Sequence, residues 1–179
     1  GVGSLEGVAV TLSWPDGAAE GQLEMRVARL DFPLLSLRAD ALEWRCPLQP
    51  DGEGSWRCRG ALTGPGVRQG ALALAISPAA TQVEIALGKS QISYEALAAA
   101  PDLSRVRLQD VPVAWLKAFL AGLWADGQWT QGQLGGDIEI QTPADDSLKV
   151  RTDLALSGLG LETPDGWLAA ADLKGTLAL

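Results

Sequence analysis

Apolar and polar residues alternate with a period of two along most of the chain. In the first such segment, apolar side chains occupy every second position from Val8 to Trp14, with small or hydroxyl side chains between them, and Pro15-Asp16-Gly17 then provides a turn. Comparable strand patterns recur at residues 23–28, 35–46, 56–64, 71–77, 81–88, 104–110, 134–140, 148–156 and 167–179. Strands that are apolar on one face and polar or small on the other are typical of an antiparallel sheet with one covered face.

In the predicted strand at residues 35–46, the alternation of apolar and polar residues changes phase partway along. Leu37 and Ala39 hold one alternation, whereas Leu42 and Trp44 hold the opposite one. An extra residue in one strand of an antiparallel pair produces such a change. The pattern therefore predicts a β-bulge near Asp40.

Two segments are predicted to be helical. The alanine-rich run at 94–100 ends just before Pro101, which fits a helix stop. The run at 112–124 begins with Pro112, a residue suited to the first helical position, and its apolar residues recur at helical spacing. We expect this second helix to cap or line one end of the apolar sheet face. The predicted fold is a single, mostly β domain over residues 1–179, a curved antiparallel sheet (β-taco or open barrel-like) with one or two short helices.

The composition supports a packed core and excludes several functions. Hydrophobic residues make up 47% of the 179 residues and charged residues 20%. The net charge of −8 argues against nucleic acid and anionic lipid head groups, both of which attract clustered Lys and Arg. The chain has no histidine, no glycine-rich phosphate loop and no carboxylate pair that a polar turn does not explain. We expect a protein that is not an enzyme and uses no metal or cofactor.

No apolar run reaches the roughly 18 residues needed to span a membrane, and the start of the chain does not have the pattern of a secretory leader. The first residues already show a strand pattern, and the last ones lie within another. We expect the chain to be a segment of a longer protein, with any export signal removed.

The only two cysteines, Cys46 and Cys58, lie in two copies of Trp-Arg-Cys on either side of Pro50-Asp51-Gly52. Two cysteines without histidine cannot complete a zinc site, and their spacing differs from the Cys-x-x-Cys of redox motifs. A hairpin turning around Asp51 and Gly52 would bring them opposite each other to within about one residue, at a separation that a disulfide bridges. Two free buried cysteines are the alternative. A disulfide would favour an oxidising compartment.

The seven tryptophans outnumber the two phenylalanines and one tyrosine, which is an unusual ratio. Most of them fall on the apolar faces of predicted strands or on the second predicted helix. They are either ordinary core residues or part of a surface that lines an elongated groove for an acyl chain or a partner strand.

The segment from Leu103 to Leu179 resembles the AsmA-like and YdbH-like (TamB-type) envelope proteins of Gram-negative bacteria. The resemblance rests on a Val-Pro-x-x-Trp-Leu helix start and a glycine-spaced strand, at Val111, Pro112, Trp115, Leu116, Gly132, Leu134, Gly136, Ile138 and Ile140. It implies an elongated, curled periplasmic sheet with an apolar interior, in a parent protein that is anchored in the inner membrane and implicated in moving phospholipids between membranes. The family has no catalytic residues to transfer to this chain.

We therefore predict a non-enzymatic periplasmic module that shields or conducts lipid acyl chains between the inner and outer membranes. The residues predicted to line its groove are Trp44, Leu74, Ile85, Trp115, Leu120, Ile138, Leu154 and Leu173. Charged substitutions at Leu74 or Ile138 would abolish lipid loading while the domain still folds. The alternative is a structural or protein-interaction component of an envelope or secretion machine, with a closed sandwich core and an exposed edge that accepts a partner strand.

Overall fold

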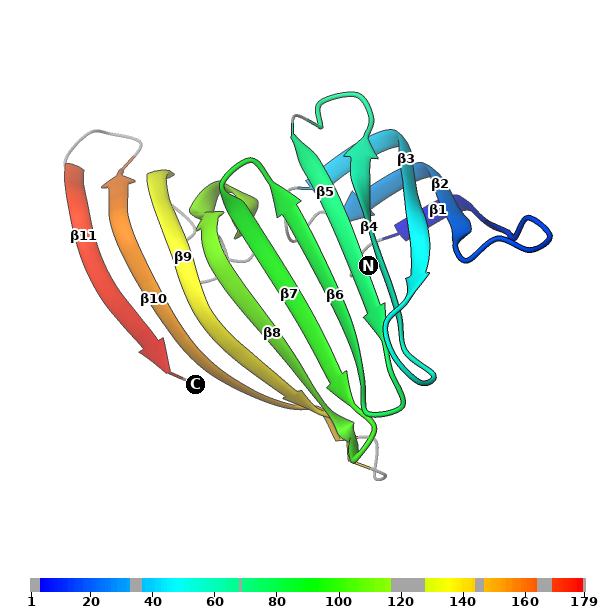
Figure 1. Cartoon of the computed structure of the whole chain (residues 1–179). Coiled ribbons are helices and arrows are strands. Elements are labelled where there is room, and N and C mark those ends of the chain that lie inside the picture. The colour runs from blue at the N-terminus through cyan, green and yellow to red at the C-terminus, as the bar shows by residue number, and fades with distance from the viewer. Residues whose placement is uncertain are drawn as a thin grey trace.

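The computed structural model describes residues 4–32, 37–67, 69–116, 128–143, 147–163 and 169–178. Within them, eleven strands form one sheet in which every strand pairs antiparallel with the next strand of the chain (Figure 1). The strands are β1 (Ser4–Ser13), β2 (Gly21–Phe32), β3 (Leu37–Pro50), β4 (Trp56–Thr63), β5 (Gly70–Ile76), β6 (Ala80–Leu87), β7 (Ser90–Leu97), β8 (Ala100–Pro112), β9 (Gln128–Gln141), β10 (Lys149–Glu162) and β11 (Ala169–Ala178). A 3-10 turn, η2 (Val113–Leu116), follows β8. The predicted fold class, a mostly β curved antiparallel sheet, is confirmed.

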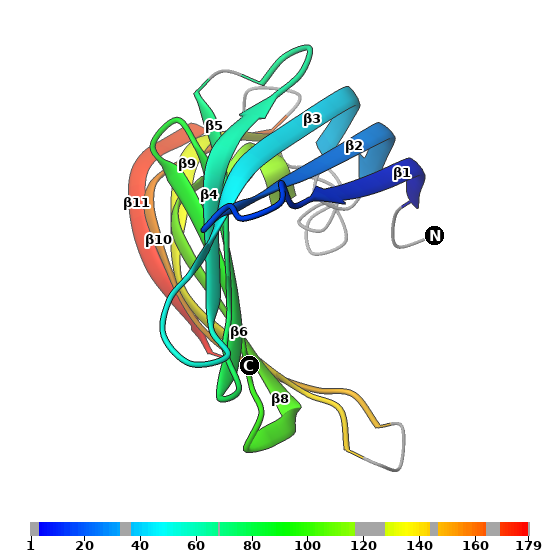
Figure 2. The same ribbon diagram turned by 45° about the vertical axis from the view of Figure 1, so that its right-hand side comes forward.

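The sheet bends along its strands and has a concave and a convex side (Figure 2). Apolar side chains of neighbouring strands stand opposite one another in rows, one of which crosses β5 to β8 through Leu72, Ile85, Ile92 and Leu108. Ile92, Leu108 and Trp115 of η2 pack against the same buried cluster. Since η2 lies on the concave side (Figure 2), the concave face is the apolar one.

On β1, β2 and β3 the alternation changes phase at one row. Gly7 on β1 and Ala41 on β3 have φ values of 60° and 50° and flank Ala28 of β2, yet the pairing registers do not shift. A Cβ on Gly7 would lie 2.7 Å from Ala28 Cβ, so glycine is needed there for space as well as for its φ. The prediction of a bulge near Asp40 is therefore wrong. The alternation does change phase there, but it does so on three neighbouring strands together and without an extra residue in any of them.

At the other side of the sheet, β8 and β10 do contain bulges. The register between β8 and β9 shifts between Leu108 and Val111, and the registers of β10 with both neighbours shift around Gly158. Asp110 and Gly158 adopt φ values of 50° and 60° at these sites. Because of the extra residue, Leu108 and Val111 both reach the apolar face although strict alternation would separate them.

The helix predicted for residues 94–100 is wrong. These residues end β7 and begin β8, and a tight turn at Ala98 and Ala99 joins the two strands. The Ala98 amide donates a hydrogen bond to the Ala79 carbonyl oxygen at 2.8 Å, which ties this turn to the β5–β6 turn. Helix propensity favours alanine, but strand pairing on both sides outweighs so weak a preference. Of the second predicted helix, η2 is the described part, and residues 117–127 lie outside the described residues.

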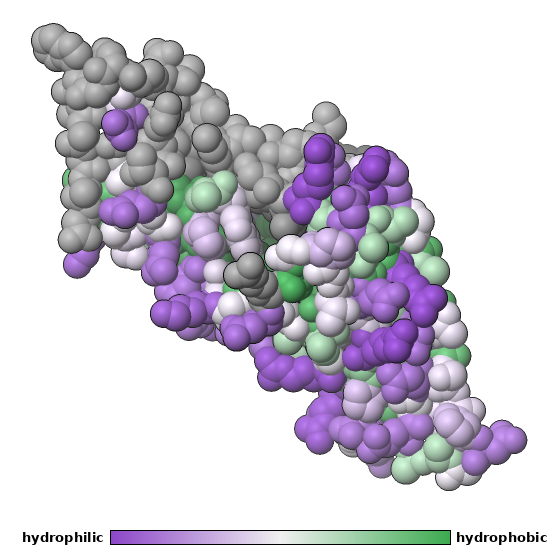
Figure 3. All heavy atoms as spheres, turned by 90° about the horizontal axis from the view of Figure 1, so that it is seen from above, coloured by the Kyte–Doolittle hydropathy of each residue, from purple (hydrophilic) through white to green (hydrophobic). Residues whose placement is uncertain are grey.

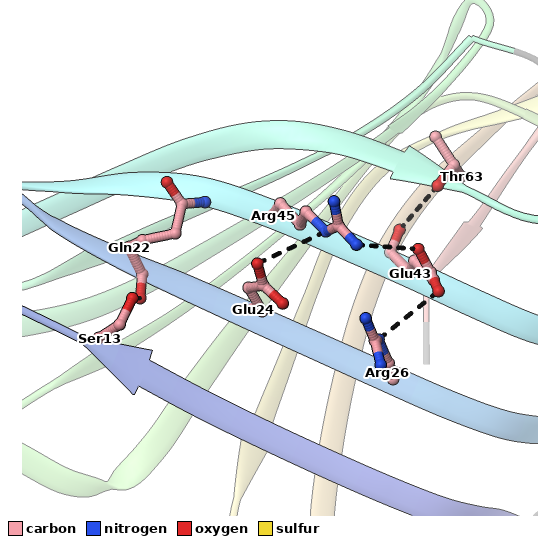
Figure 4. Close-up of polar contacts among 7 residues, drawn as sticks. All are labelled: Ser13, Gln22, Glu24, Arg26, Glu43, Arg45 and Thr63. Carbon is pink, nitrogen blue, oxygen red and sulfur yellow. Dashed lines mark hydrogen bonds and ion pairs between the residues drawn. The ribbon is translucent and has the colours of Figure 1, made fainter.

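Charged side chains pair across strands on the convex face. On β2 and β3, Arg26 Nε lies 3.5 Å from Glu43 Oε1 and Arg45 Nε lies 3.6 Å from Glu24 Oε1 (Figure 4). Thr63 Oγ1 on β4 donates a hydrogen bond to the Glu43 carbonyl oxygen at 3.3 Å. In both ion pairs the partners stand directly opposite each other in the register of β2 and β3.

The same pattern recurs between β8 and β9. Arg107 Nε lies 2.7 Å from Asp137 Oδ1, and Arg105 Nε lies 3.2 Å from Glu139 Oε1, again as directly opposite residues. The hydrogen bond to Asp137 and the charge of that carboxylate raise the pKa of Arg107. Such exposed pairs add little stability, but they favour this register over a slipped one. Seen from above, hydrophilic residues are spread over much of the coloured surface and alternate with apolar ones (Figure 3).

Candidate functional site: the central trough

The first buried cluster of the concave face consists of Trp44 and Cys46 on β3 and Cys58 on β4. The Trp44 side chain, 4% exposed, reaches over to β5, where its indole Nε1 donates a hydrogen bond to the Leu72 carbonyl oxygen at 2.9 Å. This bond satisfies the polar end of a buried indole. The cluster therefore connects β3 to β5 across β4.

Cys46 and Cys58 form a disulfide, with their Cα atoms 5.6 Å apart. The register pairs Cys58 with Leu48, two residues beyond Cys46, so the bridge runs diagonally between the strands. A Cβ on Gly60 would overlap the Arg45 carbonyl oxygen and lie 2.9 Å from Cys46 Cβ. A glycine at this position thus makes room for the close approach that the bridge requires.

Reduction of the disulfide is expected to lower the free energy of unfolding by about 3 kcal/mol or less, because the bridge closes only a short loop in the unfolded chain. Urea unfolding followed by tryptophan fluorescence, with and without reductant, measures this difference. The double variant Cys46→Ser/Cys58→Ser is the matched control, since reductant must not change its midpoint. An identical midpoint for the oxidised and reduced chains would contradict a stabilising role.

The second buried cluster lies on β8, β9 and β10, and η2 packs against it. Its buried members are Val111, Leu134 and Leu154. Trp115 of η2 contacts this cluster, and Val113 is 1% exposed. A Cβ on Gly132 of β9 would lie 3.2 Å from Val113 Cγ2, so the missing side chain lets η2 approach the sheet. The expectation that this segment caps one end of the apolar face is confirmed for η2.

Between the two clusters lies a partly exposed apolar surface, which we call the central trough. Its residues stand on the concave face of β5 to β8: Leu72, Leu74, Val83, Ile85, Ile92, Tyr94, Val106 and Leu108. Ile85 is central, since it pairs with Leu72 on one side and Ile92 on the other. The trough thus joins the two clusters into one apolar surface.

Apolar side chains are also exposed toward the edges of the concave face. Those on β1 are 50–62% exposed. At one end of the strands, the rings of Trp14 and Trp56 meet edge to face with centroids 5.3 Å apart, and both remain partly exposed. The exposed residues on β1 are Leu5, Val8, Val10 and Leu12, and further exposed residues are Ile76, Leu148, Val150 and Leu173. Exposed apolar surface of this extent is typical of an interaction or ligand-binding face.

Three of the predicted lining residues lie on β3 to β6. Ile85 and Leu74 belong to the central trough, and Leu74 also packs against the first cluster. Trp44 is a buried core residue that holds β5 through its hydrogen bond. The central trough therefore lies beside Trp44 and does not include it.

The other predicted lining residues belong to the later part of the chain. Ile138 and Trp115 are half-buried against the second cluster, and Leu154 is one of its buried members. Leu173 on β11 is 39% exposed, and Leu120 lies outside the described residues. The structure thus brings seven of the eight residues to one face and distributes them between core, trough and edge.

Two trough residues on β7, Ile92 and Tyr94, were not among the predicted lining residues. The sequence does contain a strand pattern at these positions, since Ile92, Tyr94 and Ala96 alternate with polar residues as in the other strands. The alanine-rich composition after Tyr94 led to the helix prediction and hid this pattern.

The described residues provide no obvious centre for chemistry. No group of three or more Cys, Asp or Glu side chains among them could hold a metal ion, and none of their helices could cross a membrane by length and hydropathy. A depression of about 740 Å³ on β3 to β9 is lined mainly by residues of the polar face, and Leu74, Val83 and Tyr94 also contribute to its lining. Two ion pairs lie within it, Arg59 Nη2 to Glu84 Oε1 at 2.6 Å and Arg107 Nε to Asp137 Oδ1 at 2.7 Å, so much of its lining is an ion-pair surface.

Comparisons with known proteins do not assign a family, since no family model, curated protein or solved structure matches this chain. The class defined by the fold is an open, curved, eleven-stranded antiparallel meander with an apolar concave face.

Proposed function

We propose that this chain is a non-enzymatic periplasmic module that shields lipid acyl chains or conducts them between the inner and outer membranes. The observation that carries the proposal is the central trough, where a row of apolar side chains stays partly exposed between two buried clusters. An antiparallel sheet usually buries its apolar face against a second layer. In the part of the chain that the structure describes there is one sheet, with η2 over one end of it.

The hydrophobic effect supplies the driving force for this function. Each CH₂ group moved from water onto such a surface contributes about 0.8 kcal/mol when it is fully buried. The row from Leu72 to Leu108 crosses four strands, which at about 4.8 Å between neighbours gives a path of roughly 14 Å. A hydrocarbon tail lying along this path would replace water over several CH₂ groups, and the polar convex face would keep the module hydrated.

The disulfide and the sequence resemblance support the proposed compartment. A stable Cys46–Cys58 bridge is compatible with an extracytoplasmic domain, where disulfides persist. The resemblance to AsmA-like and YdbH-like proteins narrows this to the periplasm and to a parent protein anchored in the inner membrane. The acidic net charge supports neutral or apolar partners over nucleic acid.

Native mass spectrometry of the chain purified from an oxidising compartment, with lipid extraction alongside, tests the proposal. We expect co-purified phospholipid at close to stoichiometric amounts, released by organic solvent. The intact mass also reports the deficit of two hydrogens for the disulfide. A lipid-free chain that also stays lipid-free after incubation with phospholipid would overturn the proposed function.

A second function, recognition of a partner strand by an envelope or secretion machine, is favoured by β1. β1 is an outermost strand of the sheet, and all ten of its residues are exposed. It contains neither lysine nor proline, residues that often protect sheet edges from further pairing. A lipid-free native spectrum that shows a bound peptide or a dimer would favour this function.

A further inference from the structure

We propose that the trough binds its lipid at an ester carbonyl, for which the hydroxyls of Tyr94 and Ser104 form the hydrogen-bonding position. The inference rests on the proposed lipid-binding function and defines its ligand class as neutral acyl esters, in preference to free fatty acids or plain hydrocarbon.

Tyr94 and Ser104 place two hydroxyls together on an otherwise apolar part of the concave face. The Tyr94 hydroxyl oxygen lies 3.1 Å from Ser104 Oγ, and either atom is able to donate the hydrogen bond between them. The contact runs diagonally, because Tyr94 pairs with Val106 and Ser104 pairs with Ala96 in the register of β7 and β8. One hydroxyl proton is used in this bond, so the other remains free to donate to a carbonyl oxygen. Tyr94 is 37% exposed and therefore accessible to a ligand.

The surroundings of the pair differ on its two sides along the strands. Toward η2, the next residue of β7 on the concave face is Ile92, about 7 Å from Tyr94 by the rise of two strand residues. Ile92 and Trp115 of η2 both pack against the second cluster, so the surface on this side is apolar. Away from η2, the concave face carries Ala96 and Thr81, which pair with each other. An acyl tail directed toward η2 would therefore meet apolar surface, with its carbonyl group at the hydroxyl pair.

The charges near the pair decide between an ester and a free carboxylate. The register partners around it are uncharged: Val83, Ala96, Val106 and Ile140. The arginines that follow on β8 are already paired with acids of β9, since Arg105 Nε lies 3.2 Å from Glu139 Oε1 and Arg107 Nε lies 2.7 Å from Asp137 Oδ1, so neither is left to hold a fatty-acid anion. Placing an unpaired carboxylate on an apolar surface is costly, whereas an ester carbonyl needs only one donor.

The test compares ligands that differ only at the carbonyl. Isothermal titration calorimetry measures the dissociation constants of a short-chain diacyl phosphatidylcholine, its dialkyl ether analogue and the matching free fatty acid, all below their micelle concentrations. We expect the wild-type chain to bind the diacyl lipid about fivefold to tenfold more tightly than the ether analogue, the effect of about one net hydrogen bond. The free fatty acid should bind more weakly than the diacyl lipid.

The double variant Tyr94→Phe/Ser104→Ala should lose this preference. We expect it to bind the diacyl and ether lipids equally, with its affinity for the ether lipid unchanged from the wild type. Ser93→Ala, next to Tyr94 but on the convex face, is the matched control and should keep the preference. Equal binding of the two lipids by the wild-type chain, or tighter binding of the fatty acid, would overturn this inference and leave the proposed function standing. If none of the three ligands bound, both would be overturned.

Discussion

Trp44→Ala is expected to lower the free energy of unfolding by about 3–5 kcal/mol, the range for removing a large buried aromatic side chain. Trp44 is 4% exposed and packs against both cysteines of the disulfide. The substitution also removes the donor that bonds to the Leu72 carbonyl oxygen at 2.9 Å. The loss therefore combines a cavity in the first cluster with a broken link between β3 and β5.

Urea unfolding of the oxidised chain, monitored by far-UV circular dichroism, measures this effect. Trp56→Ala is the matched control, since it also removes an indole but from a side chain that is 36% exposed and touches Trp14 at the end of the strands. We expect the control to lose about 1 kcal/mol. Equal losses in the two variants would show that Trp44 has no special role in the core.

Ile85→Glu is expected to abolish lipid co-purification while the chain keeps its fold. Ile85 lies at the centre of the trough and belongs to neither buried cluster, so a charged side chain there remains partly hydrated when no lipid is bound. A bound tail would have to desolvate that carboxylate, which is costly. Leu74 and Ile138 are less selective targets, because both pack against the clusters and their substitution also affects the core.

Native mass spectrometry with lipid extraction provides the readout, and circular dichroism with urea unfolding checks the fold. Ala86→Glu is the matched control, since it adds the same charge one residue further along β6, on the convex face between Ala71 and Gln91. We expect Ala86→Glu to retain its lipid. If the folded Ile85→Glu chain carried as much lipid as the control, the trough could not be the binding surface.

Several features of the fold could be predicted from short stretches of the chain. The alternation of apolar and polar residues identified most strands and their shared apolar face, because side chains of a strand point to opposite sides in turn. The disulfide between Cys46 and Cys58 was also predictable, since both residues belong to one hairpin. Residues 94–100 show the limit of local reasoning, because their alanine content favours helix whereas the pairing of β7 with β6 and β8 requires strands.

The candidate site depended more strongly on the tertiary structure. Trp44, Ile85 and Leu154 have the same alternating pattern in the sequence, but the first and third are core residues and only Ile85 lies in the trough. The pairing of the Tyr94 and Ser104 hydroxyls was not predicted either, because it depends on the register between β7 and β8. Residues with the same alternation in the sequence thus acquire different roles from their places in the sheet.

The sequence by itself determined the period-two strands, the polar and apolar faces and the hairpin disulfide, because each depends on residues close together in the chain. The tertiary structure alone decided the meander order of eleven strands, the bulges at Asp110 and Gly158, and the distinction between core and trough. These depend on how far the sheet bends and on where η2 packs, and both result from contacts between residues distant in the sequence.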